Sequence, residues 1–246
     1  MSKGLFITGT DTEVGKTIVT ALLAVALAER GLRVGVMKPA ESGCPLENGR
    51  LAPQDAQFLK QVSGCTTPLE VINPYTFAPP LTPALAAEQA GVTIDLEHIR
   101  TCYEQLVEQH DVVLVEGAGG LLAPLTATHS MRDLAVMLDL PVLVVAANVL
   151  GVINHTALTV TVAQQVTSVV GIVLNTPQTR DDLAVESNAE SLRRWGGAPL
   201  LGNVAHLTTF EPSTLKTHST SIDTTTLLET LRFDMGQIAS SVPTRS

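Results

Sequence analysis

The stretch "LFITGTDTEVGKTIVTALLAVAL", residues 5 to 27, decides the fold class of this chain. A short apolar run leads into a loop of small and polar residues, and a helical pattern follows the loop at once. That order is typical of a phosphate-binding loop, because backbone N–H groups of the loop and of the helix N-terminus converge on phosphate oxygens. The usual spacing is G-x-x-x-x-G-K-S/T, with four residues between the glycines, whereas Gly9 and Gly15 enclose five. The stretch therefore predicts a phosphate loop of unusual spacing.

The residues of this loop have distinct predicted roles. The backbone amides would come from Thr12, Glu13, Val14 and Gly15. Lys16 would neutralise the phosphate being transferred, and Thr17 would ligate Mg²⁺ through its hydroxyl. Asp11 stands where partitioning-type ATPases carry a second lysine in this loop, which disfavours that subclass.

The composition of the chain limits its partners. At 246 residues and 45% hydrophobic it can bury a sizeable core in one large or two small domains. A net charge of -9 argues against a non-specific nucleic-acid or anionic-membrane binder. Cys44, Cys65 and Cys102 are odd in number and lack C-x-x-C spacing, which indicates neither a disulfide framework nor a zinc site. We expect a cytoplasmic protein without a secretion signal or membrane segment, whose partners are small molecules or a second copy of itself.

Short β-branched runs alternate with helical patterns along most of the chain. The runs are nearly continuous in apolar residues, as in strands that are buried on both faces of a parallel sheet. The expected strands are 5–8, 33–38, 112–116, 142–147, 171–175 and 200–205. The expected helices are about 15–30, 54–62, 95–109, 131–138, 151–166 and 182–195, with a final one near 223–234. We therefore predict a single doubly wound α/β domain over residues 1–246, with helices on both faces of the sheet.

Two features break this alternation. Residues 43–53 and 73–84 are Pro-, Gly- and Asn-rich loops, longer than most connections, and loops of that kind are often functional. Residues 208–221 are rich in Thr and Ser, and residues 236–246 are expected to be a frayed tail.

Ligands of such sheets bind at the carboxyl ends of the strands, which directs attention to the residues after each run. Lys38 and Ser42 follow the second run, where Lys38 is either a solvated strand end or a cation facing Lys16 across the phosphates. Glu116 ends the third run and is either a second anchor for Mg²⁺ or an exposed acid before a turn. The glycines after Glu116 permit close approach of the backbone to a ligand; they are Gly117, Gly119 and Gly120.

Three further positions have open interpretations from the residues alone. Gly151, Val152, Ile153 and Asn154 begin a helix, and their free amides are either an anion site or an ordinary helix start. Asn175 ends the fifth run and would either read a purine edge or cap the strand. From its spacing, Asp55 is an ordinary acid in the first turn of a helix.

Taken together, the motifs resemble those of the dethiobiotin synthetase family, and the resemblance extends to about Leu207. They are "TGTDTEVGKT" at 8–17, "KPAESG" at 38–43, Asp55, "NPYTFAPPLTP" at 73–83, "VLVEGAGGLLAPL" at 113–125, "LGVINHTALT" at 150–159 and "APLLGNV" at 198–204. The shifted glycine spacing of the phosphate loop is a feature of that family. The resemblance implies a P-loop NTPase-like fold and a ligase that uses ATP and Mg²⁺.

The implied reaction is the closure of a cyclic urea. Diaminopelargonate would react with CO₂ to give a carbamate, the carbamate would attack the γ-phosphate of ATP, and the second amine would displace phosphate from the mixed anhydride. By the resemblance, Lys16 and Lys38 stabilise the anionic groups, and Ser42 contacts the substrate. The implied Mg²⁺ ligands are Thr17, Asp55 and Glu116.

The resemblance also implies a homodimer with shared sites. Residues 151–154 of the neighbouring subunit would hold the tail carboxylate of the substrate, and the loop around Pro80 and Pro83 would line its apolar chain. The remaining implied nucleotide contacts are Gly117, Ala118, Gly119, Asn175, Thr176, Ala205, His206 and Leu207. Ala205 stands where the family commonly has Pro, which puts contacts to the nucleotide base in doubt.

Two other classes remain as alternatives. One is a P-loop nucleotide switch or partitioning-type ATPase whose output is binding to a protein partner. The other is an amidotransferase-type synthetase, but such enzymes usually carry a glutaminase domain with a catalytic cysteine, for which this chain has little room.

Overall fold

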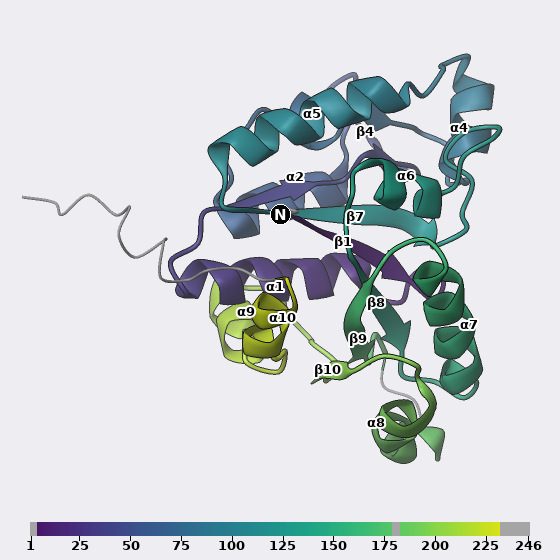
Figure 1. Ribbon diagram of the computed structural model, residues 1–246. Coiled ribbons are helices and arrows are strands. Elements are labelled where there is room, and N and C mark those ends of the chain that lie inside the picture. The colour runs from purple at the N-terminus through teal and green to yellow at the C-terminus, as the bar shows by residue number, and fades with distance from the viewer. Residues whose placement is uncertain (1–3, 179–182, 232–246) are drawn as a thin grey trace, which may run out of the picture.

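A six-stranded parallel sheet forms the centre of the computed structural model, which describes residues 4–178 and 183–231 (Figure 1). The strand order is β10-β9-β8-β1-β7-β2. The strands are β1 (Gly4–Gly9), β2 (Val34–Met37), β7 (Val112–Gly120), β8 (Val142–Ala147), β9 (Val169–Asn175) and β10 (Leu200–Val204). Each of them overlaps one of the predicted apolar runs. The predicted α/β fold with a mainly parallel sheet is therefore confirmed.

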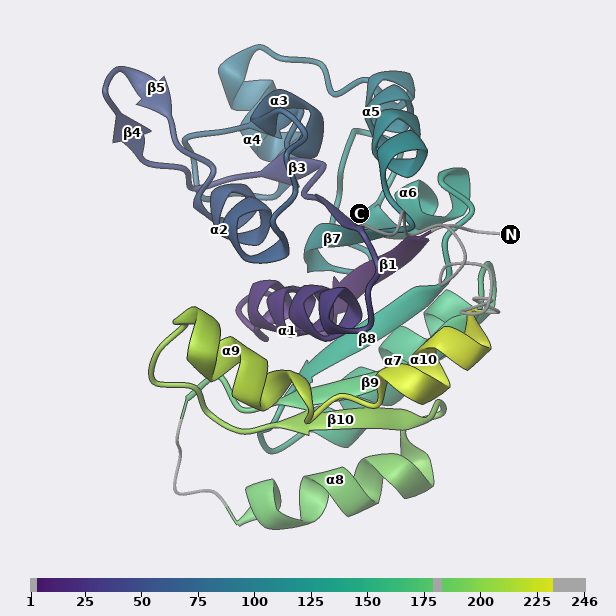
Figure 2. The same cartoon turned by 90° about the vertical axis from the view of Figure 1, so that its left-hand side faces the viewer.

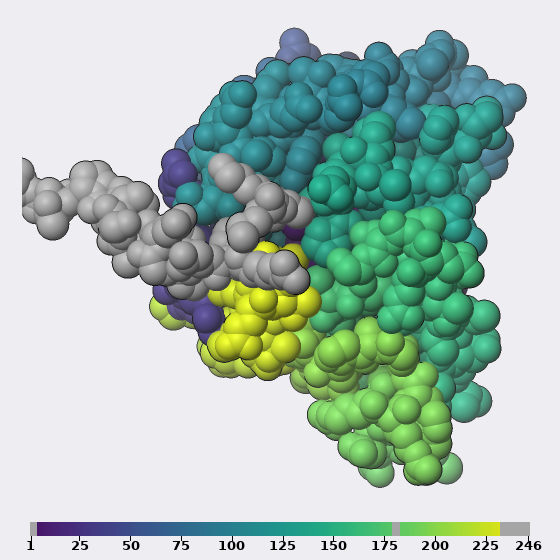
Figure 3. All heavy atoms as spheres, in the orientation of Figure 1, coloured from purple at the N-terminus to yellow at the C-terminus, as the bar shows by residue number. Residues whose placement is uncertain are grey.

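Helices cover both faces of this sheet (Figures 1 and 2). One face carries α1 (Lys16–Glu29), α9 (Pro212–Ser219) and α10 (Thr224–Thr230). The other carries α5 (Leu96–Gln109), α6 (Met131–Met137), α7 (Val152–Gln164) and α8 (Ala184–Trp195). In the space-filling view, teal atoms of the α5 region lie at the top and green atoms of the α7 and α8 regions lie below them on the right, whereas yellow atoms of α10 lie to the left (Figure 3).

The strands alternate their side chains between two hydrophobic cores. On β7, Val112 and Leu114 pack on the α1 side, whereas Val113 and Val115 pack on the α5 side. Both sets are fully buried, because β-strand side chains point to opposite faces and both faces are covered. This is the physical reason for the nearly continuous apolar runs in the sequence.

The chain between β2 and α5 contains the helix predicted near 54–62 and several elements that were not predicted. The predicted loop 43–53 contains an antiparallel hairpin, and Asn48 and Gly49 at its turn both have positive φ. An Asn-Gly pair is a strong hairpin signal in a sequence. The elements of this region are β3 (Ala40–Glu41), β4 (Leu46–Glu47), β5 (Arg50–Leu51), α2 (Gln54–Ser63), α3 (Leu69–Ile72), β6 (Tyr75–Thr76) and α4 (Pro83–Ala90). Strand β3 pairs with β6 in a separate two-stranded sheet.

Several other expectations differ from the structure or lie outside it. Helix α9 lies inside the Thr- and Ser-rich segment, for which no helix was predicted. Helix α10 ends at Thr230, and the remainder of the predicted final helix and the predicted tail lie outside the described residues. The three cysteines are free and buried, as expected for a chain without a disulfide framework. Within residues 4–178 and 183–231, no helix combines the length and apolar character that a bilayer crossing requires.

The two-sided burial of β7 predicts a large stability loss for truncation at its centre. Replacing the fully buried Leu114 by Ala removes apolar contact and leaves a cavity, so Leu114→Ala should lower the free energy of unfolding by about 2–5 kcal/mol. Leu122→Ala is the matched control, because Leu122 is 55% exposed just after the same strand and should change stability by less than about 0.5 kcal/mol. Urea denaturation followed by circular dichroism measures both values. Similar losses for the two variants would contradict the two-sided packing.

Candidate active site

The predicted phosphate loop connects β1 to α1 and is fastened to the neighbouring strands at both ends. Thr10 N donates to the Val145 carbonyl on β8 at 2.9 Å, and Asn175 Nδ2 at the end of β9 donates to the Val14 carbonyl at 2.9 Å. Gly15, the residue before α1, has φ 91°, and a Cβ atom added there would lie 2.0 Å from Asn175 Nδ2. Only glycine fits this position without strain, because side chains disfavour positive φ and no space is left for one. The loop therefore presents its amides at the carboxyl edge of the sheet.

The register of the sheet brings Lys38 and Glu116 to the same edge. Ile7 of β1 pairs with Glu116 of β7, and Met37 of β2 pairs with Val115. Lys38, which follows Met37, therefore lies beside Glu116. Beyond Glu116 the β1–β7 pairing shifts, and this irregularity contains the glycines that follow Glu116.

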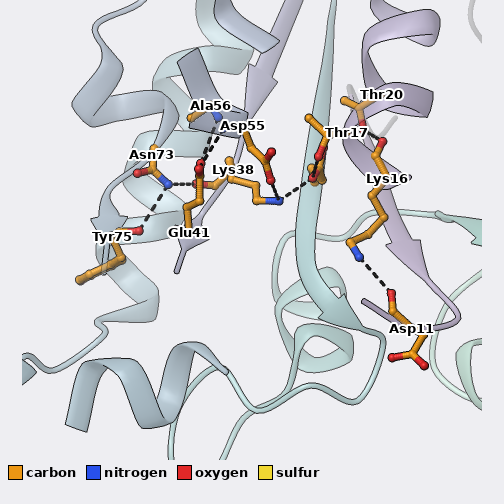
Figure 4. Close-up of polar contacts among 11 residues, drawn as sticks. Asp11, Lys16, Thr17, Thr20, Lys38, Glu41, Asp55, Ala56, Asn73 and Tyr75 are labelled. Atoms are coloured by element: carbon orange, nitrogen blue, oxygen red, sulfur yellow. Dashed lines mark hydrogen bonds and ion pairs between the residues drawn. The ribbon is translucent and has the colours of Figure 1, made fainter. Parts of the chain in front are cut away.

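An ionic cluster results from this register, in which Lys38 and Glu116 are buried and Asp55 is partly exposed (Figure 4). Lys38 Nζ lies 2.5 Å from Glu116 Oε1 and 2.9 Å from Asp55 Oδ2. Thr17 Oγ1 donates to the same Glu116 Oε1 at 2.8 Å. Glu116 is 0% exposed and Lys38 is 4% exposed, so their charges interact with little screening by water. The predicted metal-binding residues and one predicted catalytic lysine therefore form a single cluster.

Asp55 reaches this cluster because Glu41 holds the start of α2. The residue before α2 is Pro53, whose side chain offers no cap to the free amides of the helix. Instead, the carboxylate of Glu41 accepts from Asp55 N at 2.9 Å and from Ala56 N at 3.0 Å. Burial raises the pKa of Glu41, although the two amide hydrogen bonds act against that rise. This role of Glu41 was not predicted. The one sequence signal for it is that α2 begins after a proline, which has no capping side chain, so the free amides of the helix need an acceptor from elsewhere.

Two contacts hold the backbone of Lys38. Lys38 N donates to the Ile72 carbonyl at 2.8 Å, and the buried side chain of Asn73 donates from Nδ2 to the Lys38 carbonyl at 2.6 Å. Asn73 was quoted in a motif but had no predicted role. These bonds fix the point from which the long Lys38 side chain extends into the cluster (Figure 4).

Lys38 and Asp55 each have a pKa that is shifted toward the charged form. Burial lowers the pKa of Lys38, but Glu116 and Asp55 together outweigh burial, and the pKa lies above its usual value. For Asp55, burial raises the pKa, and Lys38 more than reverses that effect. Lys16 differs, because burial and then the charge of Lys38 lower its pKa to about 8, and its ammonium donates to the Asp11 carbonyl at 3.1 Å.

The cluster fits a hard divalent cation. Glu116 Oε2 is buried and has no hydrogen-bond partner among the described residues, so an oxygen lone pair is available for a ligand. No group of three or more His, Cys, Asp or Glu side chains suited to a metal occurs within residues 4–178 and 183–231. Two carboxylates and a hydroxyl suit Mg²⁺, which takes few protein ligands and completes its octahedron with phosphate oxygens and water.

A cavity of about 1280 Å³ opens beside the loop and the cluster. The predicted site residues that line it are Thr12, Glu13, Gly15, Lys16, Thr17, Lys38, Ser42, Asp55, Glu116, Ala118 and Gly119. Pro80 and Pro83 line it too, as the resemblance implied, and Leu81 and Leu85 extend this apolar wall. The unpredicted aromatic residues Phe58 and Phe210 also line the cavity and pack edge to face, with ring centroids 6.2 Å apart.

Gly120 lines the cavity as well, whereas the other predicted residues do not. Val14 is buried in the loop, and a Cβ on Gly117 would lie 3.0 Å from the Phe6 ring, so that position faces the core. Asn175 uses its amide nitrogen on the phosphate loop, which leaves Oδ1 as its remaining polar atom. Thr176 follows β9 and donates its backbone N–H to Val204. Ala205, His206 and Leu207 follow β10.

The start of α7 lies apart from the cavity of the same chain. Gly151 has φ 92° and precedes the helix, Val152 is buried, Ile153 is half-buried and Asn154 is exposed. None of the four lines the cavity. Their predicted contact with a substrate carboxylate therefore stays a prediction about a second copy of the chain.

The parallel sheet, the phosphate loop and the ionic cluster define a P-loop nucleotide-binding protein of the α/β class. A sequence model of the AAA domain family matches residues 3–214. An ATP-dependent dethiobiotin synthetase from Anaeromyxobacter sp. (strain K) is 48% identical over 194 residues, which cover 78% of this chain and 85% of that protein. The ATP-dependent dethiobiotin synthetase from Thermodesulfovibrio yellowstonii is 37% identical over 217 residues, which cover 85% of this chain and 90% of that protein. The chain belongs to the dethiobiotin synthetase family.

Solved structures are more distant. The MinC:MinD cell division protein complex of Aquifex aeolicus contains a chain with a TM-score of 0.52 and 15% identity, and 99% of each chain is covered. This likeness shows a shared fold alone.

The conformation of Gly15 predicts a specific loss of nucleotide binding. Gly15→Ala should weaken ADP affinity by at least about tenfold, because the added Cβ displaces Asn175 from the loop that it fastens. Gly31→Ala is the matched control, since Gly31 has φ 86° but nothing within 4 Å of its Cβ position. It should lose about 1–2 kcal/mol of stability from the backbone strain and keep its ADP affinity. Titration calorimetry and urea unfolding measure the two quantities. Equal ADP binding by both variants would refute the packing argument.

The lowered pKa of Lys16 predicts a pH dependence of nucleotide binding. With a pKa of about 8, roughly nine-tenths of the Lys16 side chains are charged at pH 7 and roughly one-tenth at pH 9. A phosphate anion binds the charged form, so ADP affinity without metal should fall by about tenfold as pH rises through this range. Lys16→Met keeps a side chain of similar length without the charge and should bind weakly at every pH. The same slope in both proteins would show that another group is responsible.

Proposed function

We propose that this protein closes the ureido ring of dethiobiotin from 7,8-diaminopelargonate, CO₂ and ATP. The observation that carries the proposal is the convergence of two buried lysines and two carboxylates on one cavity beside a phosphate loop. This charge arrangement suits phosphoryl transfer to an anionic acceptor, which needs fixed positive charge and positioning more than a protein nucleophile. Membership of the dethiobiotin synthetase family supports the choice of substrate.

The shape of the cavity supports the same substrate class. Its lining combines the charged groups of Lys16, Lys38 and Asp55 with the apolar side chains of Leu81 and Leu85. An aliphatic acid with two neighbouring amines could place its alkyl chain against the apolar residues and its amines near the charged residues. The volume of about 1280 Å³ leaves room for ATP beside such a substrate.

The proposed reaction has three steps. One amine adds to CO₂ and loses a proton, which gives a carbamate anion. A carbamate oxygen then attacks the γ-phosphorus, and the bond from that phosphorus to the bridging oxygen of ADP breaks. The second amine attacks the carbonyl carbon of the mixed anhydride, loses its proton and displaces phosphate, which closes the five-membered cyclic urea. Lys16 and Lys38 would hold the negative charge of the carbamate and of the transferred phosphoryl group throughout.

Mg²⁺ fits this proposal through the residues already described. Thr17, Asp55 and Glu116 would hold it, and that assignment is supported by Glu116 Oε2, which is buried and has no hydrogen-bond partner within residues 4–178 and 183–231. When bound, Mg²⁺ would neutralise charge on the β- and γ-phosphate oxygens. The residues of the chain would supply the remainder, which is orientation of the nucleotide by the loop amides and exclusion of water by burial.

A homodimer would complete the site. The amides at 151–154 lie outside the cavity of their own chain, which supports their use by a second copy to hold the tail carboxylate of the substrate. For the adenine we propose Asn175 Oδ1, Thr176 and the residues after β10, namely Ala205, His206 and Leu207. We propose that the protein acts in the cytoplasm, which its free cysteines support.

The test is product formation by the purified protein. With MgATP, bicarbonate and diaminopelargonate, mass spectrometry should detect dethiobiotin, and omission of any one component should abolish it. Lys16→Met should reduce the rate by at least about a hundredfold, because it removes a preorganised charge. ADP binding without product from a folded protein would contradict the ligase and would favour a nucleotide switch.

A further inference from the structure

We propose that Lys38 occupies the cation site before the metal arrives, so that a divalent cation must displace its ammonium from Asp55 and Glu116. The proposal rests on the proposed function in one respect, the assignment of these two carboxylates to the metal. It adds an order of events: metal binding is the step that frees a cation for the reacting anions.

Both hydrogen-bonding positions of Glu116 Oε1 are occupied in the structure. A carboxylate oxygen has two lone pairs. Lys38 Nζ approaches Oε1 at 2.5 Å and Thr17 Oγ1 donates to it at 2.8 Å, so both lone pairs are used. Oε2 of the same carboxylate has no partner among the described residues. Oε2 is therefore the Glu116 oxygen that is open to a metal, and a cation shared between Oε2 and Asp55 would lie directly beside the Lys38 ammonium.

Repulsion between the Lys38 ammonium and a dication opposes their binding to the carboxylates at the same time. An ammonium and a dication bound to the same two carboxylates would lie within a few ångströms of each other beside the fully buried Glu116, where like charges are little screened and repel strongly. Asp55 Oδ2 is also engaged by Lys38 at 2.9 Å. The ammonium must leave both carboxylates when the metal binds them.

After its displacement from the carboxylates, the Lys38 ammonium needs another anion. Its side chain is 4% exposed, and a buried cation without an anion costs several kcal/mol. The cavity that it lines would contain the other anions of the reaction, the phosphates and the carbamate. Metal and nucleotide should therefore bind cooperatively, because the phosphates provide new ion-pair partners for the Lys38 ammonium after the metal displaces it from the carboxylates.

Lys16 is a neighbour that lacks this contact. Its ammonium donates to the Asp11 carbonyl at 3.1 Å and points away from Asp55 (Figure 4). Lys16 nevertheless lies close enough to both carboxylates for their charges to affect it. Removal of Lys16 therefore changes the local field without vacating the carboxylates, which makes Lys16→Met the matched control for Lys38→Met.

The experiment measures Mn²⁺ binding to the nucleotide-free protein from the electron paramagnetic resonance signal of free Mn²⁺. Lys38→Met should bind Mn²⁺ at least about tenfold more tightly than the wild type, and Lys16→Met should lie within about threefold of the wild type. Added ADP should tighten Mn²⁺ binding in the wild type more than in Lys38→Met. Equal tightening by the two substitutions, or none by Lys38→Met, would overturn the proposal.

A second measurement uses the wild type, because Lys38→Met leaves Glu116 buried without its cation and could impair folding. In ¹⁵N NMR of lysine ammonium groups, buried and hydrogen-bonded Lys38 should give a slowly exchanging signal. That signal should move when Mg²⁺ and ADP are added together. An unchanged Lys38 signal in the loaded protein would overturn the displacement. Neither measurement involves CO₂ or diaminopelargonate, so both outcomes are independent of whether the ligase reaction occurs.

Discussion

A carboxylate that is fully shielded from water must be surrounded by donors, and Glu116 imposes this requirement on the whole carboxyl edge of the sheet. Lys38 and Thr17 meet it from two different elements, β2 and α1, and Asp55 joins through α2. In the sequence, Thr17 lies 99 positions before Glu116, and Lys38 lies 78 positions before it. The phosphate loop, the second strand and the following helix are thus held in one geometry by one buried charge.

This arrangement explains how the chain could carry out the proposed chemistry without forming a covalent bond to one of its own side chains. Positive charge at Lys16 and Lys38 lies beside the loop amides before any ligand binds, so little reorganisation would be needed during phosphoryl transfer. The two lysines differ in their partners. Among the described residues, the Lys16 ammonium donates to a backbone carbonyl alone, whereas Lys38 is engaged by two carboxylates. That difference suggests that Lys16 is ready for phosphate at once and that Lys38 becomes available with the metal.

The sequence predicted the parts of the site that depend on local pattern. Residues 9–17 have the strand, loop and helix of a phosphate site within one short stretch, and Lys38 and Glu116 each follow an apolar run. Register then brings the two strand ends together, as expected for parallel strands. Asp55 was implied only by the family resemblance, because an acid in the first turn of a helix has no distinctive pattern.

Contacts between distant residues were beyond sequence reasoning. Glu41 caps α2 from another segment of the chain. Phe210 packs on Phe58, although the two residues are 152 positions apart in the sequence. The partners of Lys38 were also not predicted. From the sequence, Lys38 was either a solvated strand end or a cation facing Lys16 across the phosphates. In the structure it is buried, and two carboxylates hold its ammonium. A single lysine side chain can reach either set of anions, and only the packed structure shows which set it contacts.

The most direct test of the account is a crystal structure of the wild-type protein with Mn²⁺ and ADP, with the metal located by anomalous scattering. We expect the Mn²⁺ peak within bonding distance of Thr17, Asp55 and Glu116, with the Lys38 ammonium withdrawn from both carboxylates toward the phosphates. A Mn²⁺ peak elsewhere, or Lys38 still bridging Asp55 and Glu116 beside the bound metal, would contradict the account.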